Sequence, residues 1–130
     1  MPEHAIPRTR FSDSDTNSLT RAILATFKLH AIFATRIDSK GTYNAHLKRF
    51  IPSNQKKGLP DILALPGGKA TWIEVKCKAT NDRLKPHQRE RIEELRATGA
   101  TVFIAEDFES FYEWFRNENQ LQTITKTTNL

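Results

Sequence analysis

Apolar residues recur along this chain with two different spacings. Helical spacing, with apolar residues three or four positions apart, predicts helices over residues 15–30, 86–98 and 108–116. Shorter apolar runs predict strands over residues 31–37, 58–65, 70–77 and 101–105, with a further short strand near 47–51 in a loop-rich stretch. The main elements therefore follow the order helix, strand, strand, strand, helix, strand, helix.

This order predicts a single α/β domain. The unit formed by strand 71–77, helix 86–98 and strand 101–105 implies a parallel strand pair joined by a right-handed crossover. We expect helices on both faces of a mixed sheet, with a functional site that opens at one sheet edge. Residues 1–11 and 117–130 are polar and predict flexible ends around a domain at 12–116.

The two strands in the middle of the chain predict a hairpin with a defined register. Gly67-Gly68 lies between two apolar flanks, and a turn centred there places Asp61 opposite Glu74. Directly opposed side chains share one face of a sheet with Cβ atoms about 5 Å apart, and Lys76 falls on the same face by alternation. The residues expected on the opposite face are Ile62, Ile73, Val75 and Cys77.

Two carboxylates this close in an apolar hairpin require compensation. Either one of them holds a proton, or a cation lies between them. A hard divalent cation with oxygen ligands suits such a pair, and Mg²⁺ is the first expectation because it uses few carboxylates together with substrate phosphate. With Lys76 beside the cation, the group suits phosphodiester hydrolysis. The alternative is that Glu74 and Lys76 form a solvated ion pair on a strand.

These residues resemble a known nuclease family. Pro60-Asp61 followed by Glu74-Val75-Lys76 is similar to the signature of the PD-(D/E)xK nucleases. From about residue 16 to about 115, the chain resembles one branch of that superfamily, the virus-type replication-repair nuclease (VRR-NUC) domain. The similar stretches are Arg36–Gly41, Lys57–Asp61, Leu84–Gln88 and Gly99–Phe103. The resemblance implies a restriction-endonuclease-like mixed sheet flanked by helices.

The resemblance also implies roles for individual residues. Asp61, Glu74 and the backbone carbonyl of Val75 would bind the metal, Mg²⁺ or Mn²⁺. Lys76 would be the catalytic lysine, and Gln88 the glutamine that the family places on the next helix. An alternative for Gln88 is that it satisfies a backbone group, as buried amides mostly do.

One departure from the family concerns the start of the first helix. Family members usually carry a glutamate there that completes the metal site, whereas this chain has no glutamate in that window. Asp15 lies four residues before Leu19 and can either substitute for the glutamate or cap the helix.

The charge distribution agrees with a nucleic-acid partner. The net charge is +5, and the residues from Arg36 to Lys57 carry six lysines and arginines against Asp38 alone. We expect Arg36, Lys56 and Lys57 to contact nucleic acid, although such a basic stretch can also be a solvated loop. His87 is expected at the surface, without a role as ligand or base.

Together these features predict a Mg²⁺-dependent endodeoxyribonuclease. The resemblance implies a resolvase-like enzyme of phage or DNA repair, acting on branched DNA such as Holliday junctions and generally homodimeric. One alternative is a non-catalytic DNA-binding module on a nuclease fold, and another is a general DNA- or RNA-processing nuclease.

The remaining features predict a soluble, cytoplasmic protein. The single cysteine, Cys77, is expected as a buried free thiol, which argues against a disulfide-built secreted domain. No apolar stretch is long enough to cross a bilayer, and no signal peptide is recognised. An aromatic stripe at helical spacing can stack on bases or pack in the core, and core packing is the favoured interpretation. Its members are Phe108, Phe111, Tyr112 and Phe115.

Overall fold

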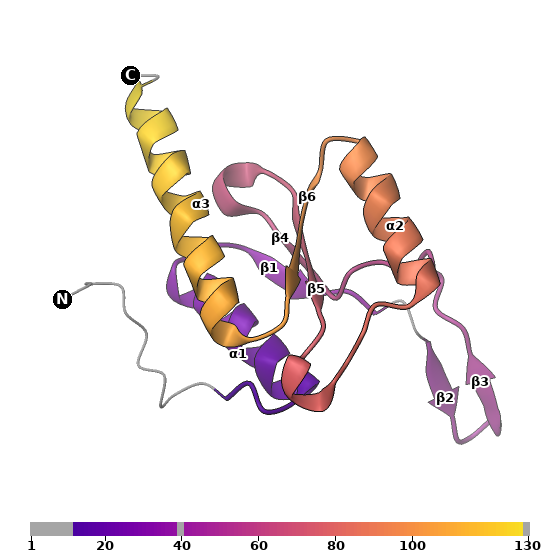
Figure 1. Cartoon of the computed structure of the whole chain (residues 1–130). Helices are drawn as coiled ribbons and strands as arrows, with labels where there is room; N and C mark the ends of the chain where they lie inside the picture. Colours follow the sequence, from indigo (N-terminus) through magenta and orange to yellow (C-terminus); the bar gives the residue numbers. More distant parts are fainter. Residues whose placement is uncertain (1–11, 39–40, 129–130) are drawn as a thin grey trace.

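A computed structural model describes residues 12–38 and 41–128 of the chain (Figure 1). Its helices are α1 (Thr16–Leu29), α2 (Pro86–Ala97) and α3 (Phe108–Thr128). The main sheet has the order β1-β4-β5-β6, and a separate two-stranded sheet pairs β2 with β3. The strand bounds are β1 Ala34–Arg36, β2 Thr42–Asn44, β3 Arg49–Ile51, β4 Ile62–Ala64, β5 Thr71–Val75 and β6 Thr101–Ala105.

The hairpin formed by β4 and β5 has the predicted register. Leu63 pairs with Trp72, and the ladder reaches the pair Ile62–Ile73 next to Asp61 and Glu74. The turn between the strands is a short 3-10 segment, Pro66–Gly68. The glycines permit it because Gly67 and Gly68 both adopt positive φ angles, of 61° and 79°.

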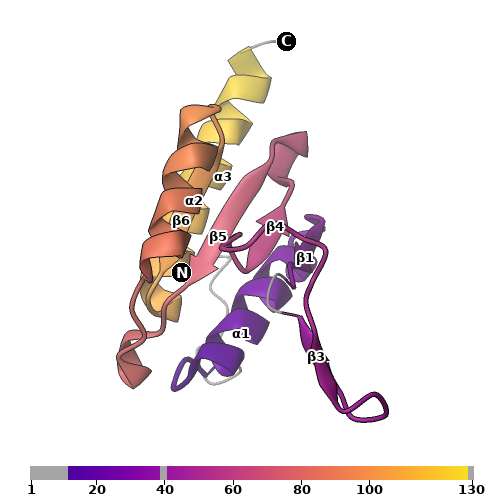
Figure 2. The same ribbon diagram turned by 90° about the vertical axis from the view of Figure 1, so that its right-hand side faces the viewer.

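The mixed α/β architecture is confirmed, and the sheet combines both strand directions. β4 runs antiparallel to β1 and β5, whereas β6 runs parallel to β5 after the crossover through α2. α1 and α3 cover one face of the sheet and α2 covers the other (Figures 1 and 2). Asp61 precedes β4 and Glu74 lies on β5, the two central strands, and the expected opening of a site at one sheet edge stays a prediction.

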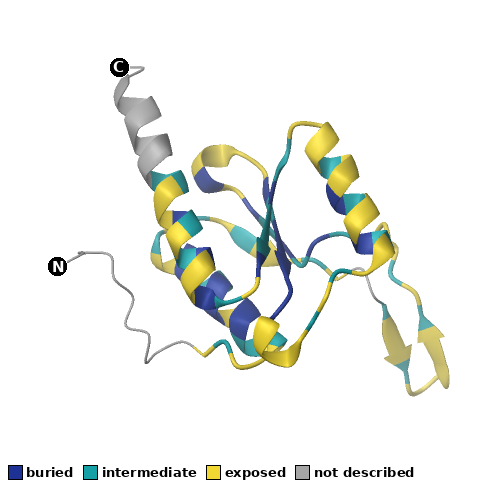
Figure 3. Ribbon diagram, viewed as in Figure 1, coloured by how far each residue is buried: buried dark blue, intermediate teal, exposed yellow. Residues whose placement is uncertain are grey.

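The core lies between the sheet and the helices α1 and α3 (Figure 3). The ring of Phe27 on α1 lies 5.7 Å from that of Phe111 and 5.6 Å from that of Phe115, both in edge-to-face contact. The aromatic stripe of α3 therefore packs in the core, as the favoured interpretation predicted. The sheet residues buried against these helices include the four expected to face away from the carboxylates, Ile62, Ile73, Val75 and Cys77.

Three local expectations differ from the structure. α3 was expected to end at Arg116 but continues to Thr128, because no glycine or proline interrupts residues 116–128. β1 spans only Ala34–Arg36 within the predicted 31–37. The loop-rich stretch contains an unexpected strand, β2, which pairs with β3 to form a hairpin projecting from the domain (Figure 1).

One further expectation stays a prediction, and another is settled only in part. The expected flexible N-terminal segment, residues 1–11, lies outside the described residues. Within the described part, no helix combines the length and apolar character needed to span a membrane.

Candidate active site

Asp61 is held at the start of β4 by a hydrogen bond to the neighbouring strand. The backbone N–H of Val75 donates to Oδ2 of Asp61 over 2.8 Å. This bond extends the pairing of β4 and β5 by one residue and leaves Oδ1 of Asp61 for another partner. In a strand, the N–H and C=O of one residue point to the same side, so the carbonyl of Val75 also points toward the β4 side.

Glu74 is a fully buried carboxyl group on the same face. Its exposed fraction is 0%, and neither Oε1 nor Oε2 has a hydrogen-bonding partner among the described residues. Burial raises the pKa of Glu74 to about 9, and the negative charge of the neighbouring Asp61 adds to the rise. With its pKa raised this far, Glu74 holds a proton at neutral pH unless a cation neutralises the pair.

Lys76 completes the charged group on this face. Only 7% of the residue is exposed, and its positive charge partly offsets the rise in the pKa of Glu74. Its Nζ lies 3.6 Å from Oδ1 of Asp82, in the loop before α2. Asp82 in turn accepts a hydrogen bond from Oγ1 of Thr16, the first residue of α1, over 3.3 Å. No sequence pattern indicates Asp82, because only the fold brings residues 16, 76 and 82 together.

Gln88 lies in the first turn of α2 and is buried, with 8% exposed. Its Oε1 accepts a hydrogen bond from the backbone N–H of Lys85 over 2.9 Å, so the alternative of a satisfied backbone group is correct for this end of the amide. Because Lys85 provides a donor, the oxygen of Gln88 must face it, and Nε2 is the end that can donate elsewhere.

Asp61 and Gln88 line one pocket of about 610 Å³. Its other charged or ionisable members are Lys57, Lys85 and His87, and the remaining lining residues are Phe50, Pro52, Ser53, Gln55, Gly58 and Leu59. Phe50 and Lys85 were not predicted to belong to the site. A phenylalanine in a polar stretch and a lysine beside a helix-starting proline are common, and neither pattern indicates a functional residue.

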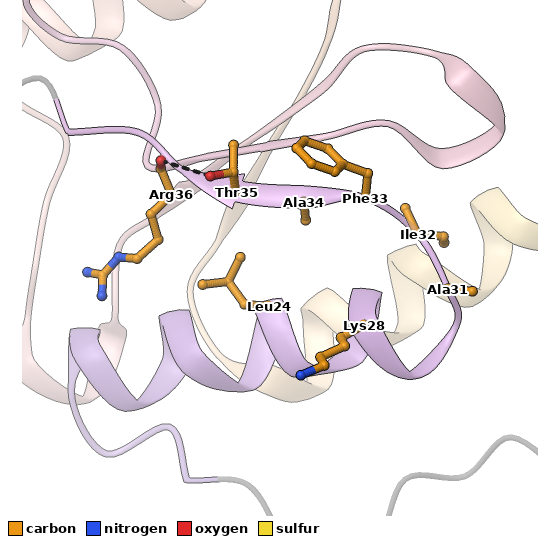
Figure 4. Close-up of a pocket in the computed structure, with 8 residues that line it drawn as sticks. All are labelled: Leu24, Lys28, Ala31, Ile32, Phe33, Ala34, Thr35 and Arg36. Carbon is orange, nitrogen blue, oxygen red and sulfur yellow. Dashed lines mark hydrogen bonds between the residues drawn. The ribbon is translucent and has the colours of Figure 1, made fainter.

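A second hollow, of about 510 Å³, lies between α1 and β1 on another part of the molecule (Figure 4). Leu24, Ile32 and Phe33 contribute apolar surface to it, and Lys28 and Arg36 are its charged members. Because it contains no carboxylate, it lacks the groups expected for hydrolysis of a phosphodiester.

The three basic residues expected to contact nucleic acid lie in different surroundings. Lys57 lines the pocket that contains Asp61, whereas Arg36 lines the second hollow. Nζ of Lys56 forms an ion pair with Oε1 of Glu94 on α2 at 2.9 Å, and both side chains are exposed. Such exposed pairs are weak, so the charge of Lys56 can still act on an approaching anion.

The loop that bears Lys57 is fixed to α2 at two points. Nε of Arg91 donates to the carbonyl oxygen of Lys57 over 3.0 Å. Gly58 adopts a φ of +84°, and a Cβ added there would lie 2.7 Å from the carbonyl oxygen of His87. Glycine is therefore required at this contact, because both the backbone conformation and the available space exclude a side chain.

The pKa of His87 reflects the positive charges around this pocket. Partial burial lowers the pKa of its imidazole, and the charges of Lys57 and Lys85 lower it further. His87 is half-buried and lines the pocket, and its expected lack of a role as ligand or base stays a prediction. A neutral imidazole among cations marks a region of positive potential suited to an anion.

The donor set fits a small divalent cation in part. Glu74 offers two buried oxygens that have no partner among the described residues. Asp61 is bound to the N–H of Val75, and the Val75 carbonyl points to the same neighbouring strand. Within residues 12–38 and 41–128, no group of three or more His, Cys, Asp or Glu side chains is arranged to hold a metal ion. Asp15 is exposed and caps α1 by accepting from the N–H of Ser18 over 2.7 Å, so it acts as the helix cap.

Known proteins include a family that matches this chain in sequence pattern and a solved structure that matches it in fold. The family model described as "VRR-NUC domain" matches residues 17–107 of the chain. A solved structure described as "VRR_NUC domain" superposes with a TM-score of 0.60 at 20% identity, covering 78% of this chain and 94% of that one. Its low identity makes it a match of fold. No curated protein matches the chain.

Proposed function

Because the chain belongs to the VRR-NUC domain family, a nuclease-type domain, we propose that it is a metal-dependent DNA endonuclease. The observation that carries the proposal is the state of Glu74. It is a buried carboxyl beside Asp61 and Lys76, and its two oxygens lack partners among residues 12–38 and 41–128. A buried carboxyl group without hydrogen-bonding partners destabilises the fold, and carboxyl groups of this kind are concentrated at functional sites.

Asp61, Glu74 and the carbonyl of Val75 are the proposed ligands of Mg²⁺ or Mn²⁺. Oxygen donors of this kind suit these hard cations. The bound cation would neutralise the two carboxylates and provide positive charge for the scissile phosphate and its attacking water. Solvent and phosphate oxygens would complete the coordination, because the protein offers few ligands.

Lys76 and Gln88 are proposed to act on the reacting groups. The Lys76 ammonium would orient water and stabilise the negative charge that develops on the phosphate oxygens. Its ion pair with Asp82 restricts where that charge can lie. Nε2 of Gln88 would donate to a phosphate oxygen or to water, while Oε1 stays bound to Lys85.

The proposed substrate is branched DNA, contacted through Arg36, Lys56 and Lys57. A chain of 130 residues contacts little DNA alone, so we propose that it acts as a homodimer. Structure-selective cleavage is preferred over site-specific cleavage because the sequence shows no base-reading motif.

The main rival is a DNA-binding module without catalysis, favoured by the role of Asp15 as a helix cap in place of a third acidic ligand. The test is to incubate the protein with branched, nicked and linear DNA and with RNA, in Mg²⁺, Mn²⁺ or chelator. Cleavage of branched DNA that needs metal and is lost in Glu74→Gln supports the proposal. Binding without cleavage under every metal would establish the module, and preferred cleavage of RNA would establish the general nuclease.

A further inference from the structure

The hairpin formed by β2 and β3 presents an aromatic pair to solvent. Tyr43 and Phe50 are direct cross-strand partners, so their side chains share one face of the two-stranded sheet. They are 60% and 55% exposed, and Leu47 in the turn between the strands is 53% exposed. The hairpin projects away from the main sheet, and most of its surface is accessible (Figures 1 and 3).

The hairpin is nevertheless a defined element. Its turn is closed by a hydrogen bond of 2.9 Å from the N–H of Leu47 to Oδ1 of Asn44. The tip of the Phe50 ring lies against Gly41, because a Cβ added to Gly41 would be 2.9 Å from Cζ of Phe50. Gly41 has a φ of +82°, which favours glycine and lets the ring approach the backbone. The ring is held at its tip although more than half of the residue stays exposed.

Phe50 also belongs to the candidate active site. It lines the same pocket as Asp61 and Gln88, and Lys57 and Lys85 are basic members of that lining. The hairpin, residues 42–51, has no acidic residue and contributes Lys48 and Arg49. An aromatic ring, cationic side chains and the carboxylate proposed to bind metal therefore line one pocket.

We propose that Phe50, together with Tyr43, stacks on an unpaired base of DNA next to the phosphate that is cleaved. The inference rests on the proposed nuclease function and names the feature of the substrate that the enzyme selects. Aromatic rings bind bases without regard to sequence, and only unpaired or displaced bases expose their faces. The cations of the pocket and hairpin would hold the adjoining phosphates.

A second copy of the chain is the competing occupant of this surface. Aromatic side chains bury about 150–250 Å² each, so three apolar side chains fall short of the roughly 800 Å² per partner of a stable interface. Two copies of the same positive hairpin would also repel each other. The small apolar area and the positive charge of the hairpin both favour DNA over a second copy of the chain.

The test measures binding in chelator, so it does not depend on cleavage. The probe is a branched duplex with 2-aminopurine at the first unpaired position, and a fully paired duplex is the reference. The variants are Phe50→Leu, which keeps an apolar side chain without a ring, and Phe50→Trp, which keeps a ring. Phe33→Leu is the matched control, because Phe33 is 62% exposed and lines the second hollow (Figure 4).

The natural chain, Phe50→Trp and Phe33→Leu are expected to quench the probe and prefer the branched duplex. Phe50→Leu should lose the quenching and bind the branched duplex between roughly fivefold and a hundredfold more weakly. Unchanged quenching and preference in Phe50→Leu would overturn the proposal. So would a change confined to the sedimentation coefficient of the free protein, which would assign the hairpin to self-association.

The two proposals fail in different ways. A protein that stacks the base but never cuts DNA would retain the stacking contact of Phe50 and lose the nuclease function. A protein whose Phe50→Leu variant still cuts branched DNA with the original preference would retain the nuclease function and lose the inference.

Discussion

The N–H of Val75 donates to Oδ2 of Asp61 over 2.8 Å, and this bond brings Asp61 beside Glu74. Asp61 precedes β4 and Val75 ends β5, so the contact lies just beyond the ladder that ends at the pair Ile62–Ile73. A backbone bond therefore holds one carboxyl, while the other, on Glu74, has no hydrogen-bonding partner in the part of the chain that the structure describes.

Replacement of Lys76 by alanine should abolish cleavage and leave DNA binding nearly unchanged. We expect the cleavage rate to fall at least about 100-fold, because a buried ammonium beside the reacting phosphate is lost. The matched control is Lys78→Ala two residues later, since Lys78 is an exposed partner of Asp107. Single-turnover cleavage and anisotropy in chelator separate the two effects. Retained turnover in Lys76→Ala would exclude its catalytic role.

The stability of the metal-free protein should decrease as the pH rises from about 4.5 toward about 9. The folded state raises the pKa of Glu74 from 4.5 to about 9, so folding binds a proton across this interval. The stabilisation is complete below the lower value and is lost as the pH passes through the upper one. Glu74→Gln should remove this slope. Urea unfolding at a series of pH values measures it, and parallel curves for the two proteins would contradict the assignment.

Asp61→Asn should stabilise the metal-free protein at alkaline pH. The asparagine oxygen can still accept from the Val75 N–H, while its amide nitrogen can donate to Glu74 in place of a repelling charge. Asp61→Ala provides the contrast, because it leaves the Val75 N–H without its acceptor, at a cost of about 1–3 kcal/mol. Thermal unfolding in chelator compares the three proteins. A lower melting temperature for Asp61→Asn than for the natural chain would argue against facing carboxylates.

Two substitutions at Gln88 should separate its structural bond from its proposed chemical role. Gln88→Glu keeps an oxygen for the N–H of Lys85 and so preserves the start of α2, but it loses the Nε2 donor. Gln88→Ala loses both. We expect both variants to cleave slowly, and only Gln88→Ala to lose stability, by about 0.5–1.5 kcal/mol. Full activity in Gln88→Glu would assign Gln88 to helix capping alone.

Binding of an anion in the pocket should raise the pKa of His87. Partial burial and the charges of Lys57 and Lys85 lower that pKa in the free protein, and a phosphate nearby would offset those charges. Lys57→Ala should also raise the pKa of His87, since it removes one of the cations. NMR titration of the imidazole, with and without a short oligonucleotide in chelator, measures both shifts. An unchanged pKa on DNA binding would place the nucleic acid elsewhere.

The hairpin that carries the carboxylates was predictable because its register had a single consistent solution. The turn at Gly67-Gly68 and the apolar flanks fixed which residues oppose each other, and the pairing of Leu63 with Trp72 agrees. The parallel partner of β5 was predictable for a similar reason, because the crossover through 86–98 is a local pattern.

Contacts between distant residues were not predictable from local patterns. Thr16 binds Asp82 across 66 positions, and the N–H of Phe108 binds Oδ2 of Asp13 across 95 positions. β2 was missed because Tyr43 lies between Thr42 and Asn44 without the apolar alternation of a strand. The contribution of Phe50 to the pocket follows from how that hairpin sits, which no local signal encodes.

The candidate active site depends on Gly58, a residue of its pocket that has no side chain and takes no part in the proposed chemistry. Any larger residue would meet the carbonyl oxygen of His87 and disfavour the backbone at a φ of +84°. The basic loop would then shift relative to α2, carrying Lys57 and Asp61 away from Gln88 even though each of them was still present. A substitution at Gly58 would thus inactivate the protein by displacing the reactive side chains from one another, although none of those side chains had itself been replaced.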